Sequence, residues 1–507
     1  MTEKINKNST DKTAVVLVNE NNYDFCFDVI EQSSIFFSDV LVISARYSEL
    51  IDLEIIKRNE RPHSILKYSP LPIPKFASNG ITKERQGDFT LLDDIFRSFV
   101  AASREPSASF FRGHRDFYRG RKKYDCINFE FEFDVYKDLA RSCFLKKSPV
   151  VFFVPTVAAP IHLALFRLFS SYGIPCLTMK HSRIGSRQLI DFAYGAKFEI
   201  VEEEMRAQDS QKNKSAEDQQ ATELLSKLKE NYSGPQYGGA TVDKKIIARN
   251  QSFCHFYEIL RRSYVEAWCL TKKSLKTRKI EQHKIRKISQ RFGGFFRGKS
   301  VYASFEKKFL SDDKFIFFPL HVEPEASLSV FAPEYMNQLA VIESIAMALP
   351  KGYRLVVKEN PNMYGLRPEF FYRSIQATPR TELVGHKYSG TDLIKRSDLT
   401  ITITGTASLE AVFFKKPVLV LGDSPILSLS GGYVFRKEKE DLNSAIRTAL
   451  RENCCSGDEL KKFVSAILAV SRTIPPVTQY GGYSTLASEE KLTIAKLCAE
   501  MFDTAFS

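Results

Sequence analysis

The segment DLTITITGTASLEAVFFKKPVLVLG, residues 398–422, decides the fold of the second half of this chain. Its apolar and β-branched residues predict a strand over 398–404. A helical run then begins after Gly405 and ends before Pro417, and a second apolar strand follows directly. This strand–helix–strand order is typical of a parallel sheet with helices on its faces.

The same pattern recurs along both halves of the chain. Helices are predicted over 160–173 and 335–349. The apolar runs that we expect to be buried strands are 14–18, 39–44, 150–154, 175–179, 314–320, 353–358, 398–404 and 418–422. Because 507 residues are too many for one ordinary core, we predict an α/β protein with two Rossmann-like domains that face a cleft.

Composition divides the chain further. Residues 205–245 are polar and rich in turn residues, which indicates a linker or an exposed insertion. The predicted segments are an N-terminal Rossmann-like domain (1–204), a polar linker or insertion with a basic helical segment (205–300), a C-terminal Rossmann-like domain (301–475) and a C-terminal helix (476–507).

The positive charge is concentrated in one segment. Residues 271–300 hold eleven Lys or Arg and one acid, Glu281, so they carry +10 of the net +13. The segment is either a solvated helix or a patch that binds an anionic membrane surface or a polyanionic product. Nucleic acid is not expected, because the nearby aromatics cluster at one end and no nucleic-acid-binding motif is present.

The sequence favours a cytoplasmic protein, peripheral at the inner membrane face. Its nine cysteines are scattered and lack CxxC spacing, which indicates a reducing compartment and argues against a zinc site. The first thirteen residues are polar and contain no signal core. The uncharged run 149–166 is interrupted by three prolines, so a strand and a helix fit it better than a membrane span.

Three polar loops follow predicted strands of the second half. They are HVEPEAS (321–327), KENPNMYGLRP (358–368) and TGTASLE (404–410). Because the carboxyl ends of parallel strands meet at one edge of the sheet, we expect these loops to converge there.

The TGTASLE loop has the features of a phosphate site. The first amides of the helix after Gly405 lack intrahelical partners, and the helix dipole favours an anion there. Thr404, Thr406 and Ser408 add hydroxyl groups, and Glu410, one turn further on, suits the paired hydroxyls of a sugar. The alternative is a well-capped helix whose glutamate pairs with a lysine.

The KENP sequence adds a cation and an amide. Lys358 ends an apolar strand, so we expect its ammonium at the sheet edge, where it could neutralise phosphate charge. Asn360 is held extended by the following proline and could contact a base or a phosphate. The alternative is a simple polar turn.

Three residues are candidates for catalysis. Glu323 and Glu325 flank a proline, and a carboxylate pair can do acid or base work. His162 begins an apolar helix of the first half and is a candidate acceptor-side base or contact, or else a core histidine.

These motifs resemble a known family. The stretches FFPLHVEPEAS, YRLVVKENP, GLRPEFFY and SDLTITITGTASLEAVFFKKPVLVLGD resemble the bacterial capsule polysaccharide biosynthesis family over residues 310–425, and 160–187 resembles it weakly. The resemblance implies a GT-B architecture, with a nucleotide-sugar donor in the C-terminal domain and the acceptor mainly in the N-terminal one. By position, Lys358 and 404–410 fall where the donor nucleotide is expected.

The implied activity is glycosyl transfer onto a lipid-linked or growing surface polysaccharide, without a cofactor or a bound metal. Some relatives use CMP-linked 3-deoxy-manno-octulosonic acid as donor. This chain has Asn360 where the family usually has histidine and Glu323 where it usually has glutamine, so the donor nucleotide stays open.

Two other functions are compatible with the sequence. A nucleotide-sugar epimerase-like enzyme would share the fold and the glycine turn, but would need neither an acceptor site nor a basic patch. A non-catalytic scaffold of a polysaccharide assembly complex would keep the fold without the chemistry. Fold alone does not decide among them.

Overall fold

The protein is described here by a computed structural model. It describes residues 12–18, 23–35, 37–44, 65–68, 140–141, 149–157, 160–210, 215–230, 257, 260–261, 264, 314–323, 326–360, 363, 367, 369–385, 388–429, 433–434, 440–451, 455–474, 483 and 486–506.

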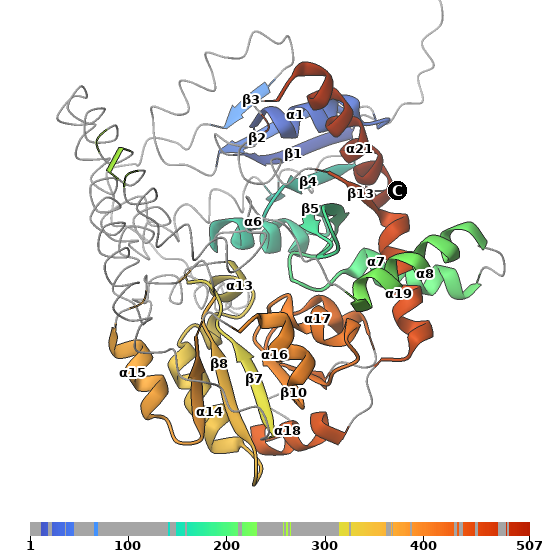
Figure 1. Cartoon of the computed structure of the whole chain (residues 1–507). Helices are drawn as coiled ribbons and strands as arrows, with labels where there is room; N and C mark the ends of the chain where they lie inside the picture. The colour runs from blue at the N-terminus through green and yellow to red at the C-terminus, as the bar shows by residue number, and fades with distance from the viewer. Residues whose placement is uncertain are drawn as a thin grey trace, which may run out of the picture.

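The second half forms a six-stranded, all-parallel sheet with the order β12-β11-β10-β7-β8-β9 (Figure 1). Numbered along the chain this is 6-5-4-1-2-3, the strand order of Rossmann folds. The strands are β7 (Phe315–Pro319), β8 (Arg354–Lys358), β9 (Thr381–Val384), β10 (Leu399–Thr402), β11 (Val418–Val420) and β12 (Tyr433–Val434).

The first half forms a seven-stranded sheet with the order β13-β6-β5-β4-β1-β2-β3. Strands β1 to β5 are parallel to one another. β6 pairs antiparallel with β5, and β13 pairs antiparallel with β6. The strands are β1 (Lys12–Val18), β2 (Phe37–Ser44), β3 (Ile65–Tyr68), β4 (Val150–Val154), β5 (Cys176–His181), β6 (Arg187–Asp191) and β13 (Ser471–Thr473). The two sheets confirm the predicted α/β class.

Helices cover both faces of the second sheet, because alternate residues of its strands point into different cores. Ile316 and Phe318 of β7 pack with α14, α15 and α18, whereas Phe315 and Phe317 pack with α16, α17 and α19. The helices of this half are α13 (Ala326–Ser329), α14 (Gln338–Ala348), α15 (Glu369–Ala377), α16 (Gly390–Arg396), α17 (Ala407–Phe413), α18 (Leu442–Arg451) and α19 (Gly457–Val470).

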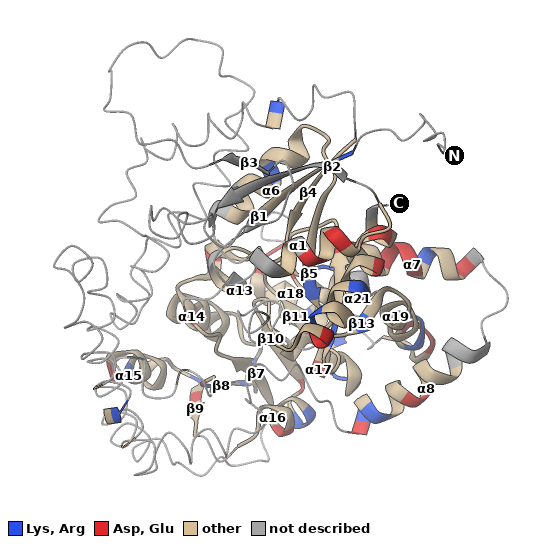
Figure 2. Cartoon of the chain, turned by 90° about the horizontal axis from the view of Figure 1, so that it is seen from above, with Lys and Arg blue, Asp and Glu red and all other residues tan. Residues whose placement is uncertain are grey.

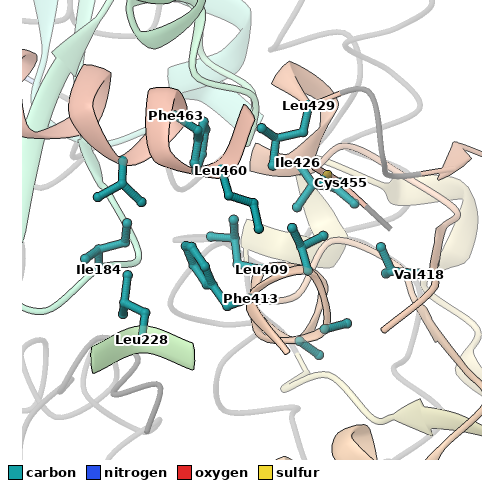
Figure 3. Packing of buried hydrophobic residues seen from close by; sticks show 14 of the residues in the cluster. Ile184, Leu228, Leu409, Phe413, Val418, Ile426, Leu429, Cys455, Leu460 and Phe463 are labelled. Atoms are coloured by element: carbon teal, nitrogen blue, oxygen red, sulfur yellow. The ribbon is translucent and has the colours of Figure 1, made fainter. Parts of the chain in front are cut away.

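The segment predicted as a linker or exposed insertion is partly helical. After α6 (Pro160–Ser171), the chain forms α7 (Glu199–Ser210) and α8 (Ser215–Glu230), which pack against α19 in a core shared by both halves (Figure 3). Acidic residues gather on α7 (Figure 2). Buried Ala221, Leu225 and Leu228 form a narrow apolar stripe within a polar sequence, which is why composition alone suggested a linker.

The chain returns to the first sheet near its C-terminal end. β13 pairs with β6, so this strand lies in the first sheet although it falls within the predicted 301–475 segment. α21 (Ser488–Phe506) packs on α1 (Tyr23–Gln32), and its Phe502 ring meets Phe153 of β4 edge-on at 5.3 Å. None of the helices in the described ranges has the length and apolar character of a membrane span.

Candidate nucleotide-binding site

The site lies at the edge of the second sheet where the strand order reverses. β7 has β8 on one side and β10 on the other, and all three strands are parallel. The chain first extends the sheet from β7 through β8 to β9 and then crosses to β10. In open α/β sheets, ligands bind outside the carboxyl ends of the strands at such a switch point. Here those ends lead to His321 and Thr404.

A hydrogen bond joins the loops after β7 and β10. The amide of Thr404 donates to Nε2 of His321 (3.2 Å), so the ring proton of the neutral imidazole is on Nδ1. Burial, with help from the charge of Arg367, lowers the pKa of His321 to about 4 and keeps the ring neutral at pH 7. A Cβ at Gly405 would lie 3.1 Å from His321 Nε2 and 3.0 Å from Thr402 Oγ1, so the turn fits closely over the imidazole.

In the first turn of α17, the groups that could bind a ligand are backbone amides rather than side-chain hydroxyl groups. Ser408 is fully buried: its hydroxyl donates to the carbonyl of Gly405 (2.8 Å) and lies 2.9 Å from Ser424 Oγ. This hydroxyl therefore stabilises the turn from inside, unlike the exposed donor that the sequence suggested. Thr406 is half-buried and its side chain makes no capping bond. The amide of Ser408 donates to the carbonyl of Gly405 (3.2 Å) and that of Gly405 to Thr402 Oγ1 (3.3 Å), which makes the amides of Thr406 and Ala407 the candidate donors to an anion.

Two further side chains of this loop are held by neighbouring segments. Thr404 Oγ1 donates to the carbonyl of Ser327 (3.0 Å), so this hydroxyl also serves the loop itself. Glu410 is half-buried and accepts a hydrogen bond from Thr391 Oγ1 (3.2 Å). It lies about one turn deeper than Thr406, as predicted from the spacing.

The loop after β8 places its polar groups differently from the prediction. Lys358 is only 4% exposed, and its Nζ lies 3.5 Å from the carbonyl oxygen of Glu359. The ammonium is thus beneath the sheet edge rather than on it. The backbone amide of Asn360 donates to Glu359 Oε1 (2.8 Å), and its backbone carbonyl accepts from the amide of Met363 (2.8 Å). These bonds define a tight polar turn.

Glu323 has a partner that the sequence did not suggest. It is fully buried, pairs with Arg367 (3.1 Å) and accepts a hydrogen bond from Gln338. Arg367 also pairs with Glu359 (2.7 Å). Glu325, the predicted partner of Glu323, lies outside the residues that the structure describes.

His162 lies in the first half, at the start of α6 and beyond the end of β4. Its Nδ1 is 2.8 Å from the carbonyl of Thr156 and must donate to it, which makes Nε2 the basic nitrogen. Burial outweighs this hydrogen bond and lowers the pKa of His162 to about 4. The imidazole is therefore neutral at pH 7, but it is a weak base.

One site feature was missed by sequence reasoning: a contact between the halves. Oδ2 of Asp423, after β11, accepts a hydrogen bond from the amide of Ala196, after β6 (2.6 Å). Burial raises the pKa of the Asp423 carboxyl, although this hydrogen bond opposes the shift. A Cβ at Gly195 would lie 2.1 Å from the same oxygen, so any larger residue there must displace the Asp423 side chain.

A buried ion pair supports the Ala196 side of that contact. Lys180 Nζ pairs with Asp191 (2.9 Å) and donates to the carbonyl of Lys197 (2.6 Å). Asp191 in turn accepts from the amides at 199 and 200, at the start of α7. Asp423 is followed by Ser424, the neighbour of Ser408, so the junction of the halves lies beside the candidate site. Within the described residues, no group of three or more His, Cys, Asp or Glu is arranged to hold a metal ion.

One family model matches the segment of the chain that contains the candidate site. The family described as "Capsule polysaccharide biosynthesis protein" matches residues 260–431, which include all three strand-end loops. No curated protein sequence matches the chain.

Solved structures with a similar arrangement are distant. A KpsC beta Kdo 2,7 transferase from Thermosulfurimonas dismutans is 14% identical, with a TM-score of 0.35, over 66% of this chain and 79% of that one. A UDP-GlcNAc 2-epimerase from Methanocaldococcus jannaschii is 12% identical, with a TM-score of 0.24, over 90% and 99%. Likenesses this weak carry no argument about activity. The match over residues 260–431 nevertheless confirms the resemblance to the capsule polysaccharide biosynthesis family that the sequence predicted.

Proposed function

We propose that the protein is a glycosyltransferase of bacterial surface polysaccharide synthesis. It binds a nucleotide-sugar donor at the switch-point edge of the second sheet and transfers the sugar onto a lipid-linked or growing polysaccharide. The observation that carries the proposal is the meeting of the His321 loop and the Thr404 turn between β7 and β10, inside the segment that matches the family.

The donor would be held mainly by backbone groups. Amides at the start of α17, with the Thr406 hydroxyl, suit a phosphate, and Glu410 suits the hydroxyl groups of a ribose or sugar. Lys358, buried at the end of β8, would stabilise the negative charge that develops on the departing nucleotide, and a low local dielectric strengthens that effect. Asn360 would contact the base or a phosphate. CMP-linked 3-deoxy-manno-octulosonic acid is one donor to test.

The acceptor would enter from the first half, beside His162. A pKa of about 4 makes His162 better suited to accept a hydrogen bond from the acceptor hydroxyl than to remove its proton. Glu323 and Glu325 stay the predicted acid–base residues, and the ion pair of Glu323 with Arg367 favours Glu325 as the one that exchanges a proton. No metal or cofactor is assigned a role.

A non-catalytic scaffold is the second candidate. It is favoured by the burial of Ser408 and Lys358, since groups engaged inside the fold are less available to a ligand. A scaffold of this kind would keep the loops but would not bind a nucleotide.

Ligand-dependent thermal unfolding separates these functions. CMP, UDP, GDP and their sugars should be compared, because a ligand of the folded state raises the melting temperature once its concentration exceeds Kd. We expect one nucleotide class to stabilise the protein. Glu410→Gln and Lys358→Met should then each weaken its binding by about 1–3 kcal/mol.

The matched controls are Glu369→Gln and Lys227→Met, which alter exposed helical ion pairs away from the site. Absence of stabilisation by every nucleotide would reject the transferase and leave the scaffold. Unchanged binding in both site variants would place the nucleotide elsewhere. Conversion of a nucleotide sugar to its epimer without any acceptor would instead support the epimerase-like function.

A further inference from the structure

We infer that Arg367 is a positioning residue of the candidate nucleotide site: it holds the loops after β7 and β8 together and so fixes His321 beneath the Thr404 turn. The inference rests on the proposed function for its ligand. Whether a buried guanidinium holds the turn in place can be measured without any ligand.

The Arg367 side chain contacts two loops at once. It is fully buried, and its Nε bonds Glu359 Oε2 (2.7 Å) while its Nη1 lies 3.1 Å from Glu323 Oε1. Its Nη2 donates to the carbonyl of His321 (2.6 Å), and the guanidinium stacks over the ring of Phe371 (4.5 Å). All three nitrogens thus lie within 3.1 Å of an oxygen of a residue that follows β7 or β8.

The charges in this cluster are well satisfied. Burial alone would lower the pKa of Arg367, but Glu359 and Glu323 outweigh it and raise that pKa. The same two carboxylate oxygens also accept bonds from neutral groups: Tyr372 donates to Glu359 Oε2 (2.8 Å), and Gln338 donates to Glu323 Oε1. A buried polar network with this many directional contacts favours one geometry.

The cluster reaches the candidate site through His321. Gln338 accepts from the His321 amide (2.7 Å) and donates to its carbonyl (3.2 Å), the same oxygen that Arg367 bonds. These bonds fix the backbone of His321, and from it the imidazole reaches the turn, where Nε2 accepts from the amide of Thr404. Arg367 therefore acts on the turn indirectly, by fixing the residue beneath it.

Stability alone does not account for such a cluster. Well-packed apolar residues of similar volume stabilise a fold as well as a buried ion cluster does, or better. Apolar side chains cannot supply the directional bonds that hold the His321 backbone, from which the ring reaches the turn. Functional turns need this kind of support, because a site displaced by about 1 Å loses much of its affinity.

Hydrogen exchange of the full-length protein tests the inference. In Arg367→Met, peptides covering 402–408 should exchange about tenfold faster than in the wild type, as expected for a lost hydrogen-bonded arrangement, while α18 and α19 keep their protection. Arg373→Met is the matched control: this arginine makes an exposed pair with Glu369 (2.7 Å), so the turn should stay unchanged.

A second variant covers the case in which Arg367→Met fails to fold because two carboxylates are left unpaired. The triple variant Arg367→Met, Glu323→Gln, Glu359→Gln removes those charges, and we expect it to fold with the same fast exchange over 402–408. Wild-type protection of the turn in the folded triple variant would overturn the inference and leave Arg367 a charge-balancing residue only.

Nucleotide affinity provides an independent readout. If the wild type binds a nucleotide, the triple variant should bind it at least about tenfold more weakly, by the loss of roughly one hydrogen bond to a charged group, whereas Arg373→Met should bind it normally. If the wild type binds none, the proposed function fails, but the exchange experiment still decides whether Arg367 positions the turn.

Discussion

An alanine at position 195 would disturb the contact between the two halves of the chain. Its Cβ would lie 2.1 Å from Oδ2 and 3.2 Å from Cγ of Asp423, and the three nearest heavy atoms all belong to that residue. Such an approach is too close for any real Cβ, so the carboxylate must move. Its bond to the amide of Ala196 (2.6 Å) is then lost.

The expected change in the free energy of unfolding follows from two opposed effects. Losing a hydrogen bond to a charged group costs about 1.5–3 kcal/mol. Gly195 is not among the glycines with positive φ, so an alanine there also restricts the unfolded chain and stabilises by about 0.4–1 kcal/mol. We therefore expect Gly195→Ala to lower the free energy of unfolding by about 0.5–2.5 kcal/mol. In an Asp423→Ala background the clash is absent, and the same substitution should be neutral or stabilising.

Urea denaturation of the wild type, both single variants and the double variant measures this change of sign as a coupling energy. Gly457→Ala is the matched control, since a Cβ there meets nothing within 4 Å and its effect should be the same in both backgrounds. If Gly195→Ala shifts the unfolding midpoint equally with and without Asp423, the alanine is not acting through this contact and the reasoning is refuted.

Three further predictions concern other parts of the chain. Asp191→Asn leaves the buried cation of Lys180 without its partner and should cost about 3–5 kcal/mol of unfolding free energy; a loss below about 1 kcal/mol in urea denaturation would contradict the buried pair. Because burial lowers the pKa of His162 from 6.5 to about 4, the unfolded chain binds more protons between these values and stability should fall as pH falls through that window. Melting temperatures measured from neutral to acidic pH should fall less steeply for His162→Gln, and parallel curves would argue against the shift. Segment 271–300, which lies outside the described residues, should make the protein float with anionic liposomes in a low-salt density gradient and dissociate from them at high salt. Protein that stays in the soluble fraction at low salt would contradict the membrane proposal.

The strands buried on both faces were the most predictable elements, because such strands appear in the sequence as short apolar runs. β4 has the predicted bounds, Val150–Val154, and β7 and β8 differ by a residue or two at their ends. β10 ends at Thr402, earlier than the apolar pattern suggested. Ile403 is still fully buried, which continues the pattern, but the amide of Thr404 already bonds His321.

The convergence of the site loops could be predicted, but their internal bonding could not. Parallel topology brings the strand-end loops to one edge, and that follows from the order of elements alone. Which side chains face outward depends on contacts between distant residues: Arg367 lies 44 positions after Glu323, and Asp423 is 227 positions from Ala196. The ammonium of Lys358 was expected to emerge at the sheet edge because of its strand-end position, yet the side chain is buried.

The return of the chain to the first sheet has a consequence for folding during synthesis. Phe25, Phe153 and Met179 share a core with Phe502 of α21, a helix that the ribosome makes roughly 300 residues after β6, or about 15–60 s later at ~5–20 residues per second. Until then, this face of the first sheet is covered by α1 but lacks α21, and the edge of β6 lacks its partner β13. A partly covered apolar face and an unpaired strand edge are the surfaces that holdase chaperones bind and that promote aggregation. Completion of the first sheet and its core is therefore tied to synthesis of the second half.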